Sequence, residues 1–179
     1  MKEENVSPST QQQYDHYEWL RAACDALLPL RPEGAKGHLI SSEGFEDLLS
    51  ILAGVSLMGC KPPIIVADYD QSCRIVDRGG DGLLEQRHYT AYVLCKGSST
   101  RPEEKRRAMA QSRALADQLA ARLIAHFYRG ESGLRHLQAD MIEVLDIGAT
   151  GDQFQGVALR YSILRPRAAR IDQSFWAQE

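Results

Sequence analysis

Apolar residues recur at intervals of three and four positions in three stretches of the chain, which is the spacing of one helix face. The first stretch covers residues 14–28 and ends at Pro29, because proline lacks the backbone N–H that a helix interior requires. The second covers residues 44–58 and the third, which is the longest, covers residues 102–128. We expect each stretch to form a helix.

The third stretch carries the clearest signals for the ends of a helix. Thr100 and Glu103 have the spacing of a capping box, in which each side chain bonds the backbone N–H of the other residue. Pro102 is tolerated in a first turn, and Gly130 is a natural stop. The predicted buried stripe consists of Leu115, Ala116, Leu119, Ala120, Leu123, Ile124 and Phe127.

Elsewhere the apolar pattern changes to a period of two, which predicts strands. Residues 64–69 and 73–76 form two short strand-like runs around a predicted turn at 70–72, and residues 34–42 are predicted to be a loop. The clearest strand is 88–96. It is apolar on both faces, so we expect it to lie centrally and to be covered on both sides.

The end of the chain predicts a hairpin, with strands at 141–147 and 156–164 around a loop at 148–152. Together these elements predict an α/β (α+β) fold in one domain over residues 13–164. A mixed or antiparallel sheet of about five strands would carry the long helix packed across it, with two further helices at the N-terminus. Residues 1–12 are predicted to be a disordered lead-in, and residues 165–179 an Arg-rich tail that breaks the last strand.

Composition narrows the class of protein without naming a function. The 179 residues include 21 Lys and Arg against 24 Asp and Glu, a net charge of -3, which disfavours a bulk nucleic-acid binder. The longest apolar stretch, residues 48–58, is too short to span a bilayer, and the polar N-terminus lacks a signal peptide. We expect a cytoplasmic protein without a membrane partner. Its cysteines are expected to be reduced and mostly buried: Cys24, Cys60, Cys73 and Cys95.

Candidate catalytic groups are sparse. Four carboxylates, those of Asp68, Asp70, Asp77 and Asp81, could share a divalent ion, although neighbouring arginines could equally neutralise them. The histidines lack metal-ligand spacing, and no nucleophile elbow or phosphate-binding glycine motif occurs. We therefore expect neither catalysis nor a cofactor, and a metal-dependent enzyme using the four carboxylates is the alternative.

Charge is unevenly distributed along the chain. Residues 1–50 carry nine acids and four bases, whereas residues 101–135 carry eight bases and four acids. The basic helix can be a solvated face, a contact between identical subunits, or a nucleic-acid-binding surface. The last residues either fold back on the domain or dock on a partner. The candidate interaction surface comprises Arg106, Arg107, Arg113, Arg122, Arg160, Arg165, Arg167, Arg170, Phe175 and Trp176.

The order of elements over residues 60–164 resembles that of phage tail-terminator and minor tail proteins from prophage-like clusters. The similar segments are an extended run at 63–66 followed by Asp68, the strand at 89–95, the helix at 102–127 and the closing hairpin at 147–157. The resemblance implies a structural protein that self-associates, as a homo-oligomeric ring, and contacts other tail-type proteins. It also implies a place in a virion or a tail-like particle rather than free in the cytoplasm.

Overall fold

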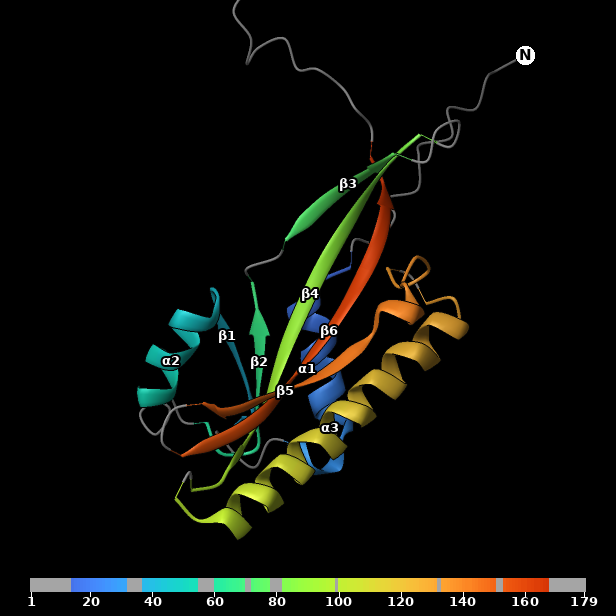
Figure 1. The fold of residues 1–179 in the computed structure, drawn as a ribbon. Coiled ribbons are helices and arrows are strands. Elements are labelled where there is room, and N and C mark those ends of the chain that lie inside the picture. Colours follow the sequence, from blue (N-terminus) through green and yellow to red (C-terminus); the bar gives the residue numbers. More distant parts are fainter. Residues whose placement is uncertain are drawn as a thin grey trace, which may run out of the picture.

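The computed structural model describes residues 14–31, 37–54, 60–69, 72–77, 82–98, 100–131, 133–150 and 153–167. They form a single α+β domain in which a mixed sheet carries a long helix, as the sequence predicts (Figure 1). The sheet has six strands where about five are predicted. The helices are α1 (His16–Ala26), α2 (Phe45–Gly54) and α3 (Pro102–Tyr128), with short 3-10 turns at Leu28–Leu30 and Ala139–Met141. The strands are β1 (Leu39–Ser42), β2 (Ile64–Asp68), β3 (Cys73–Asp77), β4 (Leu83–Lys96), β5 (Glu143–Thr150) and β6 (Phe154–Pro166).

Strand β4 organises the sheet, whose order is β1-β2-β4-β6-β5. Only β1 and β2 are parallel, and the other neighbours are antiparallel. Both β2 and β3 pair with one edge of β4, β2 along residues 90–94 and β3 along residues 83–87. The two strands therefore run in the same direction. Residues 70 and 71 of the turn predicted between them lie outside the described residues.

The predicted loop at residues 34–42 is wrong at its end, because Leu39–Ser42 is the strand β1. These four residues, Leu-Ile-Ser-Ser, are too few to show a periodicity. Their strand conformation comes instead from pairing with the open edge of β2, where Leu39 lies opposite Ile65 and Ser42 opposite Asp68. This pairing supplies the sixth strand.

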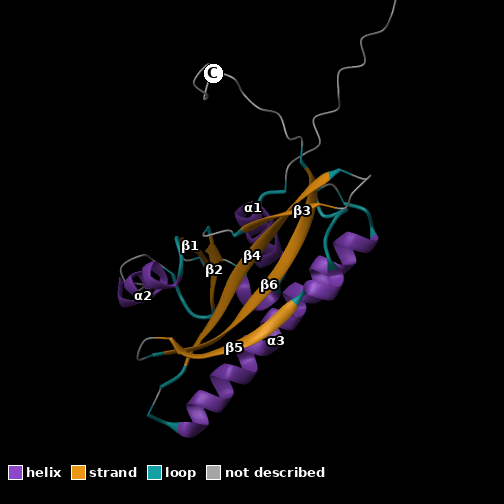
Figure 2. Cartoon of the chain, turned by 45° about the horizontal axis from the view of Figure 1, so that its top comes forward, coloured by secondary structure: helices purple, strands orange, loops and turns teal. Residues whose placement is uncertain are grey.

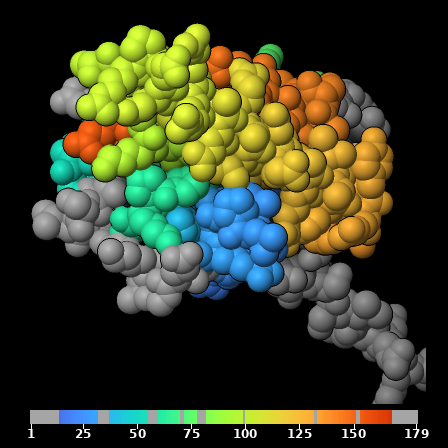
Figure 3. All heavy atoms as spheres, turned by 90° about the horizontal axis from the view of Figure 1, so that it is seen from below, coloured from blue at the N-terminus to red at the C-terminus, as the bar shows by residue number. Residues whose placement is uncertain are grey.

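Both faces of β4 are covered, which confirms the prediction of a central strand. On one face Tyr89, Ala91, Val93 and Cys95 pack in the larger core with α1 and α3. On the other face Tyr92 and Leu94 pack against α2 in a smaller core. Figure 3 shows α1 and α3 side by side on the first face. The indole N–H of Trp19 in α1 donates to His126 in α3 at 3.4 Å.

Helix α3 begins and ends where predicted, but without the capping box. Pro102 is its first residue and Gly130 follows its end with a φ of 66°, a left-handed conformation that favours glycine. Arg101 occupies the N-cap position without a side-chain cap bond, and the Thr100 hydroxyl contacts Ser98 at 2.9 Å instead. The predicted stripe faces the core, with Leu119 and Leu123 buried. Among the described helices, none is both long and apolar enough to cross a bilayer.

The C-terminal strands are longer than predicted. Strand β5 extends through three positions of the expected loop, to Thr150, and β6 begins at Phe154. The proline at position 166 does not break β6 early, because it is the strand's last residue, where a missing N–H is tolerated. Pro166 lies opposite Leu84, and the Arg167 N–H donates to the Leu83 carbonyl at 2.9 Å.

Candidate interaction surface

The structure divides the arginines of the predicted interaction surface among separate places. Arg106, Arg107 and Arg113 are exposed on α3, where Arg106 lies 3.2 Å from Glu103 and Arg113 forms an ion pair with Asp146 of β5. Arg122 lies further along α3 and is half-buried. Much of the positive charge on this helix is thus matched by nearby acids, which weakens its attraction for phosphate.

The remaining members lie on other elements. Arg160 is exposed on β6, on the sheet face that also carries α2. Arg165 is half-buried and donates to the Tyr14 carbonyl at 3.2 Å and to the Tyr89 hydroxyl at 3.3 Å. Arg167 lies 3.5 Å from Glu85. The predicted members Arg170, Phe175 and Trp176 lie outside the described residues.

The acidic cluster does not converge among the described residues. Asp68 lies opposite Thr90 and Asp77 opposite Leu83, so they are seven β4 positions apart, about 23 Å at strand spacing. The predicted members Asp70 and Asp81 lie outside the described residues. Within the described ranges, no group of three or more His, Cys, Asp or Glu side chains is arranged to hold a metal ion.

Asp68 instead connects the sheet to α2. The residue is 5% exposed, and its carboxylate accepts the Gly44 N–H at 3.0 Å, just before α2 begins. The Tyr92 hydroxyl of β4 donates to the other carboxylate oxygen at 3.2 Å. Gly44 has a φ of 88°, and the Leu48 N–H bonds its carbonyl at 3.1 Å, so the start of α2 is fixed by this contact.

Asp68→Ala is expected to lower the free energy of unfolding by about 1–3 kcal/mol, because two partly buried donors lose this acceptor. Asp68→Asn keeps the shape and one accepting oxygen, so its loss should be smaller. Urea denaturation of both variants measures the difference. An Ala variant as stable as wild type would contradict this role of Asp68.

His88 and Ser162 have the contact expected of a base and a nucleophile, but they lie within the sheet. The Ser162 hydroxyl is 2.8 Å from His88 Nδ1, and the two residues are directly opposite each other on β4 and β6. Ser162 is only 2% exposed, so a substrate carbonyl cannot reach its oxygen in this conformation. The pair therefore acts as a cross-strand hydrogen bond.

A buried polar network that the sequence did not suggest attaches α1 to the sheet. His16 Nε2 lies 2.9 Å from the Thr90 carbonyl, which can only accept, so Nε2 carries the proton. His16 Nδ1 then accepts the Tyr161 hydroxyl at 2.7 Å, and Tyr161 in turn accepts the Tyr14 hydroxyl. Burial lowers the pKa of His16 to about 4 and raises the pKa of both tyrosines. A closed network of this kind positions a helix.

The prediction that the cysteines are mostly buried holds for two of the four. Cys24 and Cys95 are buried, and burial raises the pKa of the Cys24 thiol to about 12. Cys60 is partly buried, whereas Cys73 is exposed on β3. All four are free thiols. The exposure of Cys73 reflects the unusual position of its strand.

Strand β3 is part of a projecting structure that we call the β arm, defined as β3, residues 83–88 of β4 and residues 162–166 of β6. Figures 1 and 2 show β3 lying beyond the end of β2, away from α2 and α3. No residue of β3 belongs to either core, and four of its five residues are exposed. Ile75 at its centre is 53% exposed.

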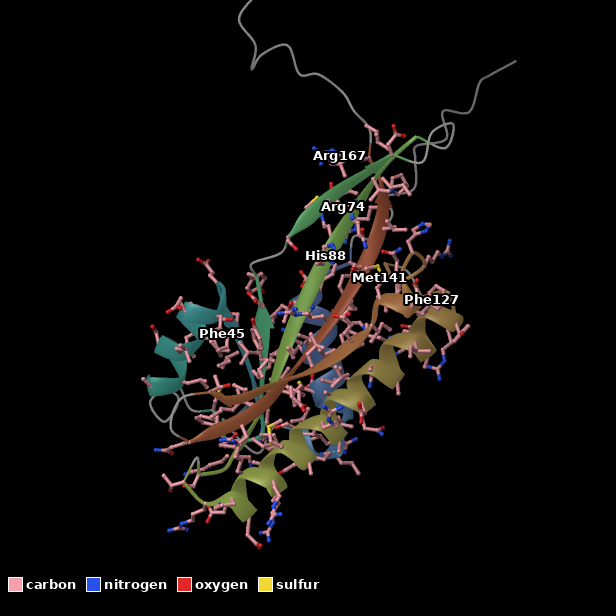
Figure 4. All side chains as sticks on the ribbon, in the orientation of Figure 1. Phe45, Arg74, His88, Phe127, Met141 and Arg167 are labelled. Carbon is pink, nitrogen blue, oxygen red and sulfur yellow. The ribbon has the colours of Figure 1, made fainter. Side chains whose placement is uncertain are left out.

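The β arm carries an excess of positive charge. Its described residues and Arg167, which directly follows β6, include four arginines and two acids. One acid, Glu85, forms ion pairs with Arg87 and Arg167, and the hydrogen bond from Arg87 lowers its pKa. Arg74 is exposed on β3 and Arg167 at the end of the arm (Figure 4).

Helix α2 has the opposite charge. Residues 37–54 contain three acids, Glu43, Glu46 and Asp47, and no Lys or Arg. The outer side of α2 also exposes apolar groups, because Phe45 is 43% and Leu49 36% exposed. Figure 4 shows Phe45 on α2 and Arg74 on the β arm in different regions of the molecule.

No protein-family model matches this chain, and no curated protein matches it significantly. The fold defines the chain as a single α+β domain. The resemblance to phage tail-terminator proteins stays a prediction.

Proposed function

We propose that this protein is a non-enzymatic structural component that associates with copies of itself, in the manner of a phage tail-terminator or minor tail protein. The observation that carries the proposal is the β arm. Among the described strands β3 pairs only with β4, so it is an edge strand of the described sheet. The backbone of an edge strand can pair with a strand of another chain.

The side chains of β3 support the same function. Ile75 is exposed on one face of the strand and Val76 is half-buried on the other, outside both cores. An exposed apolar side chain at the centre of a strand, with a charged residue beside it, suits a binding surface. The resemblance in element order supports a ring as the form of assembly.

A second candidate function, nucleic-acid binding by α3, is favoured by the exposed Arg107 and the basic charge of residues 101–135. The ion pairs of Arg101, Arg106 and Arg113 with nearby acids count against it. These pairs would have to be broken before the arginines could contact phosphates, which reduces the gain from counterion release.

Light scattering coupled to size-exclusion chromatography tests the two functions on the full chain. We expect a discrete species several times heavier than the 20.0 kDa chain, which dissociates on dilution. A protein that stays at 20.0 kDa over the accessible concentration range would contradict self-association. A monomer that becomes heavier only when duplex DNA is added, in a salt-dependent way, would favour the second function.

A further inference from the structure

We propose that the β arm of one copy docks on helix α2 of the next copy, so that the subunits associate head to tail. The inference rests on the proposed self-association and names the two surfaces that meet. It assigns α2 as the receiving surface and β3, with Arg74 and Arg167, as the inserting one.

Charge supports this pairing over a symmetric one. The described arm together with Arg167 has four arginines against two acids, whereas residues 37–54 have three acids and neither Lys nor Arg. Two arms facing each other would bring positive surfaces together, and two α2 helices would bring negative surfaces together. Like charges across an interface are costly, so arm-to-α2 contact is the complementary arrangement.

The apolar groups fit the same pairing. Ile75 is 53% exposed on the arm, and Phe45 is 43% exposed on α2. Each lies close to the charges of its own surface, in the same strand as Arg74 and beside Glu46 on the helix. An apolar centre surrounded by charged residues is the usual anatomy of a specific protein interface.

The two surfaces are rigidly connected through β4. Residues 83–88 of this strand form part of the arm, and Tyr92, further along, packs in the core under α2. Asp68 fixes the start of α2, and the Phe45 ring lies edge-on to the Tyr92 ring with centroids 6.1 Å apart. One copy can therefore use both surfaces at once. A repeated contact of this kind closes into a ring or continues as a filament.

Two charge-reversal variants test the pairing. The arm variant carries Arg74→Glu and Arg167→Glu, and the α2 variant carries Glu43→Lys and Glu46→Lys; all four side chains are exposed. Each variant alone is expected to need at least about tenfold more protein to reach half-assembly. Circular dichroism melts confirm that each is folded, and Arg74→Glu alone, which leaves the Glu85 ion pairs intact, should give a smaller effect in the same direction.

Mixing the two variants gives the decisive result. The reversed arm of the first is complementary to the reversed α2 of the second, and their native surfaces are complementary to each other. An equimolar mixture is therefore expected to assemble, with equal numbers of each variant by native mass spectrometry. The matched control on α3, Arg107→Glu with Asp117→Lys, reverses two exposed charges outside the proposed interface and should leave assembly unchanged.

The outcomes separate this inference from the proposed function. A wild-type monomer would overturn self-association itself. Wild-type assembly that both variants retain, or that the mixture fails to restore, would overturn only the arm-to-α2 pairing. Loss of assembly in the α3 control would place the interface on α3. Duplex DNA binding that the arm variant abolishes, with assembly unchanged, would assign the arm to nucleic acid and also overturn the pairing.

Discussion

Lowering the pH from 7 to 4 is expected to reduce the free energy of unfolding by about 3 kcal/mol through His16 alone. Its pKa is about 4 in the folded protein against 6.5 for an unperturbed histidine. The unfolded chain therefore binds more protons between these two values, and protonation favours unfolding there. The loss of unfolding free energy caused by His16 is small above pH 6.5, grows as the pH falls and levels off below pH 4.

The cause of this shift is burial. Loss of solvent around the imidazole is the largest effect and lowers the pKa, while the bond to the Thr90 carbonyl and the charges of Asp68 and Asp15 oppose it. The hydrogen bonds also require the neutral ring, because Nδ1 accepts the Tyr161 hydroxyl. A proton on Nδ1 would force that hydroxyl to reverse its direction.

Urea denaturation at several pH values between 4 and 7 measures this effect. His16→Gln removes the titrating group, so its free energy of unfolding should fall less steeply toward pH 4 than that of wild type. Tyr161→Phe is the matched control. It removes the two hydrogen bonds of the Tyr161 hydroxyl but keeps the His16 imidazole buried, so stability should drop at every pH while the dependence on pH persists. If the free energy of unfolding fell equally steeply toward pH 4 in His16→Gln and in wild type, His16 would not be the source of the pH dependence.

The long, strongly periodic elements could be predicted from the sequence, because their own residues determine them. Helix α3 has a continuous apolar stripe, and β4 has apolar residues on both faces. Strand β1 could not be predicted, because four residues show no period and its conformation depends on the edge of β2.

The interaction surface was harder to predict, because it depends on where elements lie rather than on their composition. The arginines of the long helix and of the C-terminal segment are predicted from the sequence to form one surface. In the structure, Arg113, Arg160 and Arg167 lie on different parts of the fold. The pattern of residues 73–76 predicts a strand, but it does not indicate that four of the five residues of this strand are exposed. The network of Tyr14, His16 and Tyr161 joins positions about 145 residues apart and leaves no local pattern.

Gly156→Ala is expected to be among the most damaging single substitutions, with a loss of about 3 kcal/mol at the upper range for overpacking. Gly156 lies in β6 opposite Leu94 of β4 and Gly148 of β5. An added Cβ would overlap the Leu94 side chain and would lie 2.8 Å from the Val93 carbonyl oxygen. Leu94 is fully buried, so it has little freedom to move away.

Two further variants separate steric overlap from a general cost of replacing glycine. Gly54→Ala, where a Cβ meets nothing within 4 Å, should be neutral or slightly stabilising, because alanine favours a helix. Adding Leu94→Val to Gly156→Ala should recover only part of the loss, because the Val93 oxygen belongs to the backbone of a central strand and cannot yield. Thermal and urea unfolding measure all three. If Gly156→Ala were no more destabilising than Gly54→Ala, the close packing of β6 against β4 would be incorrect.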